Sequence, residues 1–231
     1  MTASSYDRIG QAYARFGATN PWNERYDRPA IHGLAGDVAG LDVLDVGCAA
    51  GVLSEQLVTR GARVVGVDGS PVMLAFARER LGDRAEFHLA DLALPLDFLA
   101  DGSFDLVTAS LVMHYLEDWG PVLRELRRVL RPGGALVMSV HHPEGWHWYD
   151  LPDYFATTLV DDTWNIGGTP MDVRFYHRPL GAMFGALRGA DFRVDEVVEP
   201  MPLPEVEAED PRVWAMLTTA PRFLYFRAVK A

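Results

Sequence analysis

The sequence is almost free of cysteine. Among its 231 residues, Cys48 is the only one. A single thiol cannot form a disulfide within the chain, and such sparse use of cysteine is typical of proteins in a reducing cytoplasm. We therefore expect a cytoplasmic protein that folds without a disulfide.

Long apolar runs are also missing. No run approaches the roughly 18 apolar residues that a membrane-spanning helix needs. The first ten residues, MTASSYDRIG, lack a basic start followed by an apolar stretch, so they do not resemble a signal peptide. We expect no membrane partner.

Positive charge is scarce. The chain has 21 Lys and Arg against 32 Asp and Glu, which gives a formal net charge of −11. Binding to a phosphate backbone requires the opposite balance. The densest basic stretch, residues 124–131, is interleaved with Leu and Val at helical spacing, which favours the surface of a helix over a nucleic-acid patch. We expect no nucleic-acid partner.

The chain is rich in short apolar segments that alternate with helical ones. Alternation at this spacing predicts an α/β fold, a parallel sheet with helices on both faces. Predicted strands cover 41–46, 62–68, 85–91, 104–110, 135–142, 192–200 and 221–230. Predicted helices cover 4–16, 27–38, 51–60, 71–81, 121–130 and 178–190, and 202–211 reads as an acidic, solvated loop.

Residues 143–178 break this rhythm. They are rich in Trp, Tyr, Pro, Asp and Gly and show no clean period. We interpret them as a partly extended insertion and not as a separate domain. The aromatic side chains and the length favour a substrate lid with Trp146 and Tyr149 as binding residues. A cover for the sheet or a dimer contact is the alternative.

The stretch LDVLDVGCAAGVLSEQL, residues 41–57, predicts a strand, a tight turn and a helix. A dinucleotide site would need G-x-G-x-x-G here. Counted from Gly47, the second and third glycine positions hold Ala49 and Val52. The acids nearby would repel a pyrophosphate. They suit a ligand with a positively charged amino or sulfonium group.

Acidic residues end three successive predicted strands. Asp45, Asp68 and Asp91 occupy these positions. The carboxyl edge of an open parallel sheet is where ligands bind. Asp68 could accept both hydroxyls of a ribose, and Asp91 could accept from an adenine amino group. Each alone could equally be an ordinary surface acid.

Five motifs, in order, resemble those of class I S-adenosylmethionine-dependent methyltransferases, the group that includes ubiquinone-pathway-like enzymes. They are VLDVGCAAG, VVGVDGSPVML, HLADLALPL, FDLVTASLVMHYLEDW and LRELRRVLRPGGALVMSVHHP. The resemblance is strong over residues 40–142 and weak in the flanks. It implies a doubly wound, Rossmann-like sheet of seven mostly parallel strands, with an antiparallel last strand beside the fifth. One domain, 1–231, would comprise a helical lid (1–39), the cofactor core (40–142), the insertion (143–178) and a C-terminal part (179–231).

The resemblance also implies S-adenosylmethionine as cofactor and S-adenosylhomocysteine as product. The glycines of the first motif would let the backbone pass the methionine part, while Asp68 would hold the ribose and Met73 would pack on the adenine. YDRIGQAY matches a lid pattern of the family, with Tyr13 over the cofactor and Tyr6 near the substrate. The cofactor residues it implies are Tyr13, Asp45, Gly47, Cys48, Gly51, Asp68, Gly69, Met73, Asp91, Leu92 and Ser110.

The methyl acceptor is a separate question. Transfer from a sulfonium is a displacement that depends mostly on positioning and desolvation, and a base is needed only if the acceptor loses a proton. His114 and His141 follow two strand ends and are the candidate bases, or else they only shape the pocket.

Further substrate-binding candidates are His142, Tyr176 and His177. Arg174 and Arg178 could grip an acceptor carboxylate or phosphate, or merely neutralise the surface. HHPEGWH lacks metal-ligand spacing on a helix, so we expect no metal.

These inferences predict a methyltransferase for a small-molecule acceptor, acting as a monomer or homodimer. Two alternatives remain open from the residues. One is a module that binds S-adenosylmethionine without transferring methyl groups. The other, disfavoured by Ala49, Val52 and Asp91, is an NAD-dependent oxidoreductase.

Overall fold

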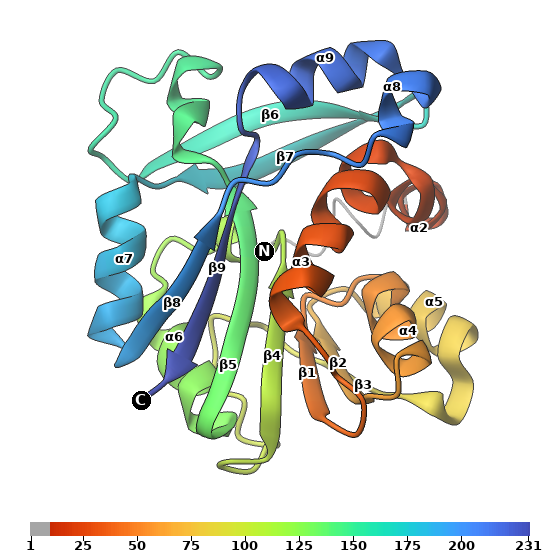
Figure 1. Ribbon diagram of the computed structural model, residues 1–231, viewed down its shortest axis with the longest axis vertical. Coiled ribbons are helices and arrows are strands. Elements are labelled where there is room, and N and C mark those ends of the chain that lie inside the picture. Colours follow the sequence, from red (N-terminus) through yellow and green to blue (C-terminus); the bar gives the residue numbers. More distant parts are fainter. Residues whose placement is uncertain (1–9) are drawn as a thin grey trace.

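The computed structural model describes residues 10–231, without the side chains of residues 11–13 and 15. Its centre is a seven-stranded sheet in the order β3-β2-β1-β4-β5-β9-β8 (Figure 1). The first five strands pair in parallel, and β9 lies antiparallel between β5 and β8, which confirms the predicted fold. The strands are β1 (Asp42–Val46), β2 (Arg63–Asp68), β3 (Glu86–Leu89), β4 (Phe104–Ser110), β5 (Leu130–His141), β8 (Phe192–Val198) and β9 (Phe223–Lys230).

The register of the strands brings four polar residues to one edge of the sheet. Asp45 on β1 lies opposite Thr108 on β4, and Ser110 at the end of β4 lies opposite Ser139 on β5. Because parallel strands end at the same edge, Asp68 and His141, the last residues of β2 and β5, reach that edge as well.

Two layers of helices cover the sheet. Helices α3 (Arg28–Ala35) and α4 (Val52–Thr59) pack on one face, and α6 (Gly120–Val129) and α7 (Leu180–Gly189) pack on the other. Helix α5 (Pro71–Leu81) packs against β2 and β3. The i, i+3, i+4 spacing of apolar residues explains why these helices bury one side: α6 buries Val122, Leu123, Leu126 and Val129.

A two-stranded hairpin, β6 (Thr158–Ile166) and β7 (Thr169–His177), lies across the carboxyl edge of the main sheet (Figure 1). Its turn is Gly167-Gly168, and both glycines have positive φ, as a tight two-residue hairpin turn requires. Alternate residues of β7, Met171, Val173 and Phe175, are buried. Residues 143–177, which include the short helix η4 (Pro143–His147), are called the lid below.

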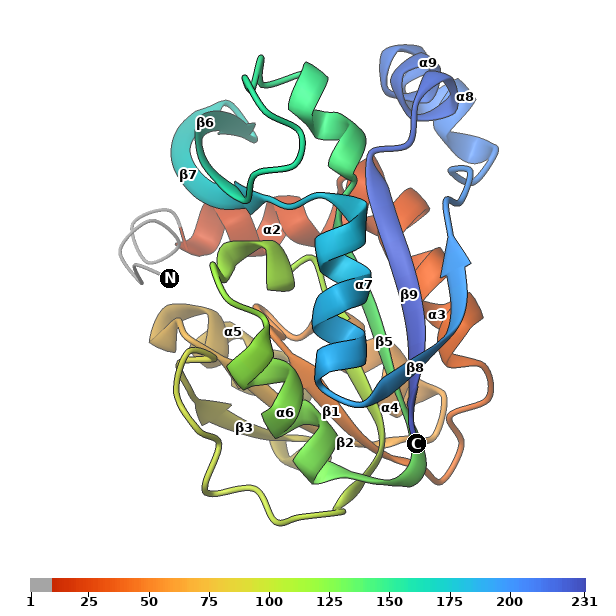
Figure 2. The same ribbon diagram turned by 90° about the vertical axis from the view of Figure 1, so that its left-hand side faces the viewer.

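The chain before β1 forms a second cover. Helix α2 (Gly10–Thr19) lies beneath the hairpin, as Figure 2 shows, and contacts β6, α5 and the following π-helix η1 (Trp22–Asp27). Arg28, the first residue of α3, joins that helix to α2, because its guanidinium donates to the carbonyls of Gly17 and Ala18 at 2.9 and 2.6 Å.

The prediction of a solvated loop over 202–211 is wrong. This stretch contains α8 (Glu205–Glu209), and α9 (Pro211–Thr219) begins immediately afterwards. The side chain of Asp210 accepts hydrogen bonds from the amides of Arg212 and Val213, and Pro211 occupies the first turn. An Asp cap followed by Pro is a helix-start signal, which the acidic composition of the stretch obscured.

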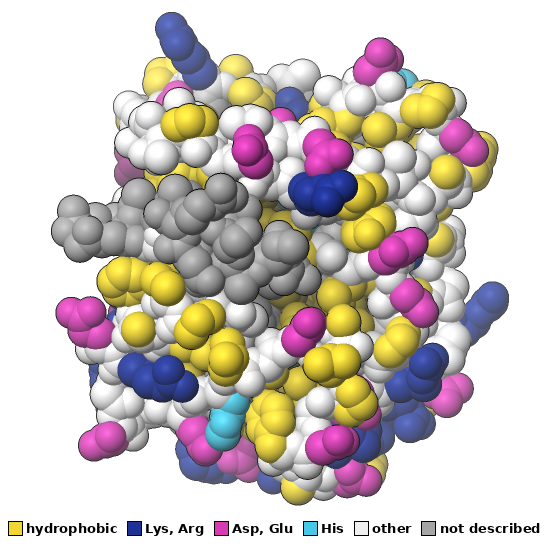
Figure 3. Space-filling model, turned by 180° about the vertical axis from the view of Figure 1, so that it is seen from behind, with side chains coloured by type: hydrophobic (Ala, Val, Ile, Leu, Met, Phe, Trp, Pro, Cys, Tyr) yellow, Lys and Arg dark blue, Asp and Glu magenta, His cyan; other side chains and the backbone are white. Residues whose placement is uncertain are grey.

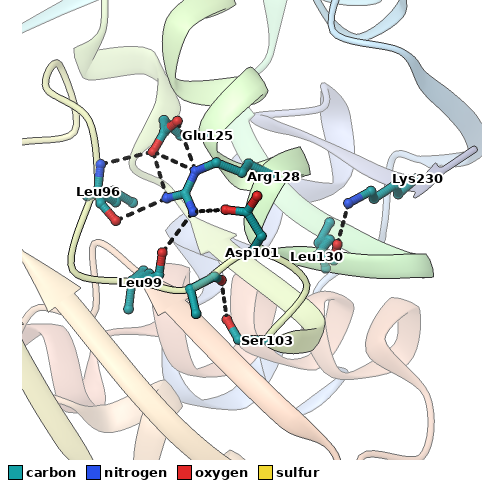
Figure 4. Close-up of polar contacts among 9 residues, drawn as sticks. Leu96, Leu99, Asp101, Ser103, Glu125, Arg128, Leu130 and Lys230 are labelled. Atoms are coloured by element: carbon teal, nitrogen blue, oxygen red, sulfur yellow. Dashed lines mark hydrogen bonds and ion pairs between the residues drawn. The ribbon is translucent and has the colours of Figure 1, made fainter.

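The basic stretch 124–131 is used inside the fold. Arg128 donates to the carbonyls of Leu96 and Leu99 and pairs with Glu125 and Asp101 (Figure 4). Through these bonds α6 holds the long connection between β3 and β4. On the face seen in Figure 3, basic side chains are interspersed with acidic ones. Within residues 10–231, no helix is long and apolar enough to span a membrane.

Candidate active site

A cavity of about 400 Å³ lies at the carboxyl edge of the sheet, between the strand ends, the α2–η1 segment and the lid. We call its sheet side the floor and include in it Asp27 of η1, which is hydrogen-bonded to Ser110 at the end of β4. Floor residues include Asp45, Gly47, Cys48, Ala49, Asp68, Met73, Ser110, Val112, His114 and His141. The lid contributes Gly145, Trp148, Tyr149, Trp164 and Asn165. Two further lining residues are Phe223, which begins β9, and Arg222 directly before it.

The loop between β1 and α4 requires small residues. Gly47 has φ +70°, and a Cβ built there would lie 2.5 Å from Cγ2 and 2.7 Å from Cβ of Val112. Gly51 caps α4 with φ +74° and packs against Ala77 and Leu81. Ala49 has φ +46°, a conformation that glycine adopts more easily. The bare backbone of this loop therefore forms the cavity wall.

Asp68 ties the loops after β1 and β2 together. Its Oδ2 accepts from the amide of Ala49 at 2.9 Å, and its Oδ1 accepts from the amide of Ser70 at 2.8 Å. The carboxylate also lines the cavity, beside the buried Met73. A carboxylate fixed by backbone amides is a rigid acceptor for hydroxyl groups of a ligand.

Asp45 braces the floor. Its two oxygens accept from Ser54 Oγ at 2.6 Å and from Thr108 Oγ1 at 2.9 Å, which joins β1 to α4 and β4. Burial raises the pKa of Asp45 to about 6, against the opposing effect of these hydrogen bonds. Its geometry is that of a support for the loop.

Asp27 is a floor residue that the sequence analysis missed. It is 1% exposed, lines the cavity and accepts from Ser110 Oγ at 2.5 Å. Burial raises its pKa, while the hydroxyl groups around it lower it. No motif marked it, because its position depends on how η1 packs against β4 and β5.

His114 and His141 stack, with ring centroids 3.9 Å apart and an interplanar angle of 13°. Both ring nitrogens of His114 and Nδ1 of His141 are buried without a hydrogen-bond partner among the described residues, whereas Nε2 of His141 is not among these buried atoms. Burial lowers the pKa of His141 to about 3 and that of His114 well below its usual value. Both imidazoles are therefore neutral at pH 7.

The lid side of the cavity is aromatic. Trp164 lies 5.9 Å and Phe223 6.0 Å from the His141 ring, measured between centroids. Burial raises the pKa of Tyr149 to about 12, so its hydroxyl stays protonated. We call the space bounded by Trp148, Tyr149, Trp164, Phe223, His114 and His141 the aromatic chamber.

Several predicted site residues line the cavity and others do not. His142 lines it, yet both its nitrogens are occupied: Nε2 lies 2.7 Å from Glu199 Oε1, and Nδ1 accepts from the amide of Glu144. Predicted residues outside the cavity lining are Gly51, Gly69, Asp91, Leu92, Trp146, Tyr176 and His177.

Several of these residues make contacts elsewhere in the fold. Asp91 is exposed and accepts from the amide of Ala93, a local turn, while Leu92 belongs to the core. Tyr176 points to Glu117, and Nε2 of His177 lies 2.9 Å from the Tyr154 carbonyl oxygen. These residues therefore do not line the cavity, and their contacts with a ligand stay predictions. Tyr6 and the side chain of Tyr13 lie outside the described part of the chain.

The two arginines proposed from RFYHRPL are also away from the cavity. Arg174 pairs with the exposed Asp161, and Arg178 lies over the Trp119 ring and donates to the Leu116 and Glu117 carbonyls. Arg222 is the lid-side cation that lines the cavity instead. Among residues 10–231, no three His, Cys, Asp or Glu side chains are grouped as metal ligands.

These residues fit S-adenosylmethionine. Three carboxylates, Asp27, Asp45 and Asp68, line the floor and suit a ligand that carries a sulfonium and an ammonium group. A cavity of about 400 Å³ falls in the range of ligand sites. The floor and fold together define an α/β enzyme that binds an adenosyl cofactor at the carboxyl ends of its strands.

Comparisons with known proteins agree with this class. Residues 44–138 match a family described as a methyltransferase domain. A solved S-adenosylmethionine-dependent methyltransferase from Mesorhizobium loti is similar with a TM-score of 0.69 and 30% identity, over 87% of this chain and 96% of that one. The chain belongs to the class I S-adenosylmethionine-dependent methyltransferases, which confirms the predicted family, enzyme class and cofactor.

Two curated relatives match over a smaller part. A demethylmenaquinone methyltransferase of Clavibacter sepedonicus is 37% identical over 142 residues, 60% of this chain and 57% of that enzyme. A ubiquinone biosynthesis O-methyltransferase of Acinetobacter baylyi is 32% identical over 108 residues, 46% of this chain and 45% of that enzyme. The matched segments thus span about half the length of each relative.

Proposed function

We propose that this enzyme methylates a small molecule with a planar ring, which binds in the aromatic chamber. The observation that carries the proposal is the continuity of one cavity from the floor to the lid: Asp68 and Met73 line one part, and Tyr149 and Trp164 line the other. Planar aromatic walls favour a flat ligand. The names of the two curated relatives, which refer to quinone compounds, support the same class of acceptor.

The cofactor supplies a methyl group on a sulfonium that is already activated, so the protein has mainly to align and desolvate the reactants. The floor carboxylates orient the cofactor. The lid and Phe223 exclude water and hold the acceptor ring. Enclosure strengthens the electrostatic interactions inside the chamber.

His141 is the candidate proton acceptor for an acceptor hydroxyl. Its imidazole is neutral at pH 7, and its Nε2 is not among the sealed nitrogens of the stacked pair. His114 holds the ring of His141 in place by stacking at 3.9 Å. An imidazole whose pKa is lowered to about 3 is too weak a base to deprotonate a free hydroxyl. We propose that Nε2 of His141 accepts the hydrogen bond of that hydroxyl and takes its proton only as methyl transfer makes the oxygen positively charged.

The test is an acceptor screen by mass spectrometry. Purified enzyme is incubated with S-adenosylmethionine and a panel of phenols, catechols, hydroxyquinones and aromatic amines, with tRNA and mixed protein as further substrates. The proposal predicts a 14-Da increase in a ring compound, matched by S-adenosylhomocysteine formation. Methylation of tRNA or protein together with no small molecule would contradict it.

A further inference from the structure

Charged side chains of both signs line the cavity. The floor carries the carboxylates of Asp27, Asp45 and Asp68. Arg28 lines the cavity near them, but both of its terminal nitrogens donate to carbonyls of α2. Arg222, directly before Phe223, lines the same cavity, and its guanidinium lies over the ring of the lid residue Trp148. The floor carboxylates suit the cationic cofactor, whereas Arg222 offers a positive charge to the second ligand.

The guanidinium of Arg222 has a fixed place. Its Cζ lies 3.7 Å above the centroid of the Trp148 ring. The backbone of Arg222 is held by two hydrogen bonds: its carbonyl accepts from the His142 amide at 2.9 Å, and its amide donates to the Tyr26 hydroxyl at 3.3 Å. A stacked guanidinium keeps its outer N–H groups directed in its own plane. The side chain is thus oriented before any ligand binds.

No carboxylate among the described residues forms an ion pair with Arg222. Its Nε is buried without a hydrogen-bond partner among the described residues. The acidic groups that influence its pKa are tyrosine hydroxyls, those of Tyr149 and Tyr26, and burial lowers this pKa. Arg63, Arg84, Arg128 and Arg131, by contrast, each pair with a carboxylate in this acidic chain. A half-buried arginine without a carboxylate is costly unless a ligand supplies the anion.

We infer that Arg222 binds a carboxylate on the ring acceptor and so determines which ring compounds this enzyme methylates. The inference rests on the proposed function, because it places that acceptor in the aromatic chamber. The planar guanidinium of an arginine can donate two parallel hydrogen bonds to one carboxylate. A phosphate would bring a second negative charge towards Tyr149 and an already acidic protein, so a carboxylate is the better match.

The test compares two probes of nearly the same shape, 4-hydroxybenzoate and 4-hydroxybenzamide, by titration calorimetry on protein saturated with S-adenosylhomocysteine at pH 7.5. We expect the wild-type protein to bind the carboxylate at least tenfold more tightly than the amide, as a charge-assisted bidentate contact implies. Arg222→Gln abolishes this preference, and Arg222→Lys keeps a part of it. Arg212→Gln, which removes an exposed charge on α9, leaves it unchanged.

Binding of S-adenosylhomocysteine and the melting temperature serve as folding controls for each variant. Equal affinity of the two probes, failure of both to bind, or a preference that survives Arg222→Gln would overturn the inference. The proposed function fails on a different result, the absence of methyl transfer to any small molecule. An enzyme that methylates only uncharged rings would refute the role of Arg222 while leaving the proposed function intact.

Discussion

The floor and the lid face each other across one cavity, but they are built in different ways. The floor consists of loops at parallel strand ends, where Gly47 meets Val112 so closely that a Cβ would lie 2.5 Å from it. The lid contains a two-stranded hairpin, whose turn glycine Gly168 has open space around it. The floor therefore depends on backbone geometry, and the lid depends on its large side chains. This difference suggests a fixed cofactor site under a variable acceptor site.

The largest expected effect is that of Gly47→Ala. Positive φ and the contact with Val112 together should lower the free energy of unfolding by about 3 kcal/mol. Gly168→Ala is the matched control, since its φ is +93° but nothing lies within 4 Å. It should cost about 1 kcal/mol. Urea denaturation measures both values, and equal losses would remove the distinction between the two regions.

Asp68→Ala should weaken binding of S-adenosylhomocysteine roughly 100-fold, because it removes a charged acceptor and the tie between two floor loops. Asp91→Ala is the control. Asp91 is exposed and outside the cavity lining, so its loss should change the affinity less than threefold. Calorimetric titration of both variants with S-adenosylhomocysteine measures these affinities. A large effect of Asp91→Ala would support the adenine contact that the family resemblance implies.

Trp164→Ala should act on the other substrate. Removing this chamber wall should raise the KM for the acceptor about tenfold, the cost of losing part of a large apolar contact. Binding of S-adenosylhomocysteine should stay within twofold. Trp146→Ala, from the same lid but outside the cavity lining, should leave both constants unchanged. If Trp164→Ala weakened both ligands equally, the division of labour between floor and lid would be wrong.

The histidine pair links the two regions and predicts a pH effect. The folded-state pKa of His114 is lowered by burial, so below pH 6.5 the unfolded chain binds a proton that the folded protein does not. Stability is thus lost as pH falls. In His114→Leu this loss should be smaller by about 1.4 kcal/mol for each pH unit below 6.5. Asp27 and Asp45, whose pKa values are raised, affect both proteins alike.

Urea denaturation of both proteins between pH 7.5 and 5.5 gives the difference directly. A stability difference that does not change with pH would show that His114 titrates normally. Activity at pH 7.5 is an independent readout. A loss of kcat in His114→Leu with unchanged KM for both substrates is expected from a residue that positions His141.

Much of the floor could be predicted from the sequence. Apolar strands ending in Asp45 and Asp68, with a small-residue loop between strand and helix, are local patterns that the parallel sheet brings to one edge. Asp27 and Arg222 could not be found in this way. Their positions depend on how η1 and β9 pack against the sheet, and no local spacing encodes that packing.

The hairpin of the lid has a local signal in the sequence. Asn165-Ile166-Gly167-Gly168-Thr169 contains a Gly-Gly pair between segments that alternate apolar and polar residues, which predicts a two-residue hairpin. The prediction for residues 143–178 rested on their aromatic composition and therefore did not include this hairpin. Arg174 and Arg178 were likewise predicted from composition. Arg174 instead pairs with Asp161, and Arg178 donates to the carbonyls of Leu116 and Glu117.

The most direct test of the account is the crystal structure of the protein with S-adenosylhomocysteine bound. We expect the adenosyl part to lie against Asp68 and Met73, with the sulfur directed towards His141 and the aromatic chamber left free for the acceptor. An adenosyl group seated among Trp148, Tyr149 and Trp164 would contradict the assignment of floor and lid, and with it the acceptor site and the role of Arg222.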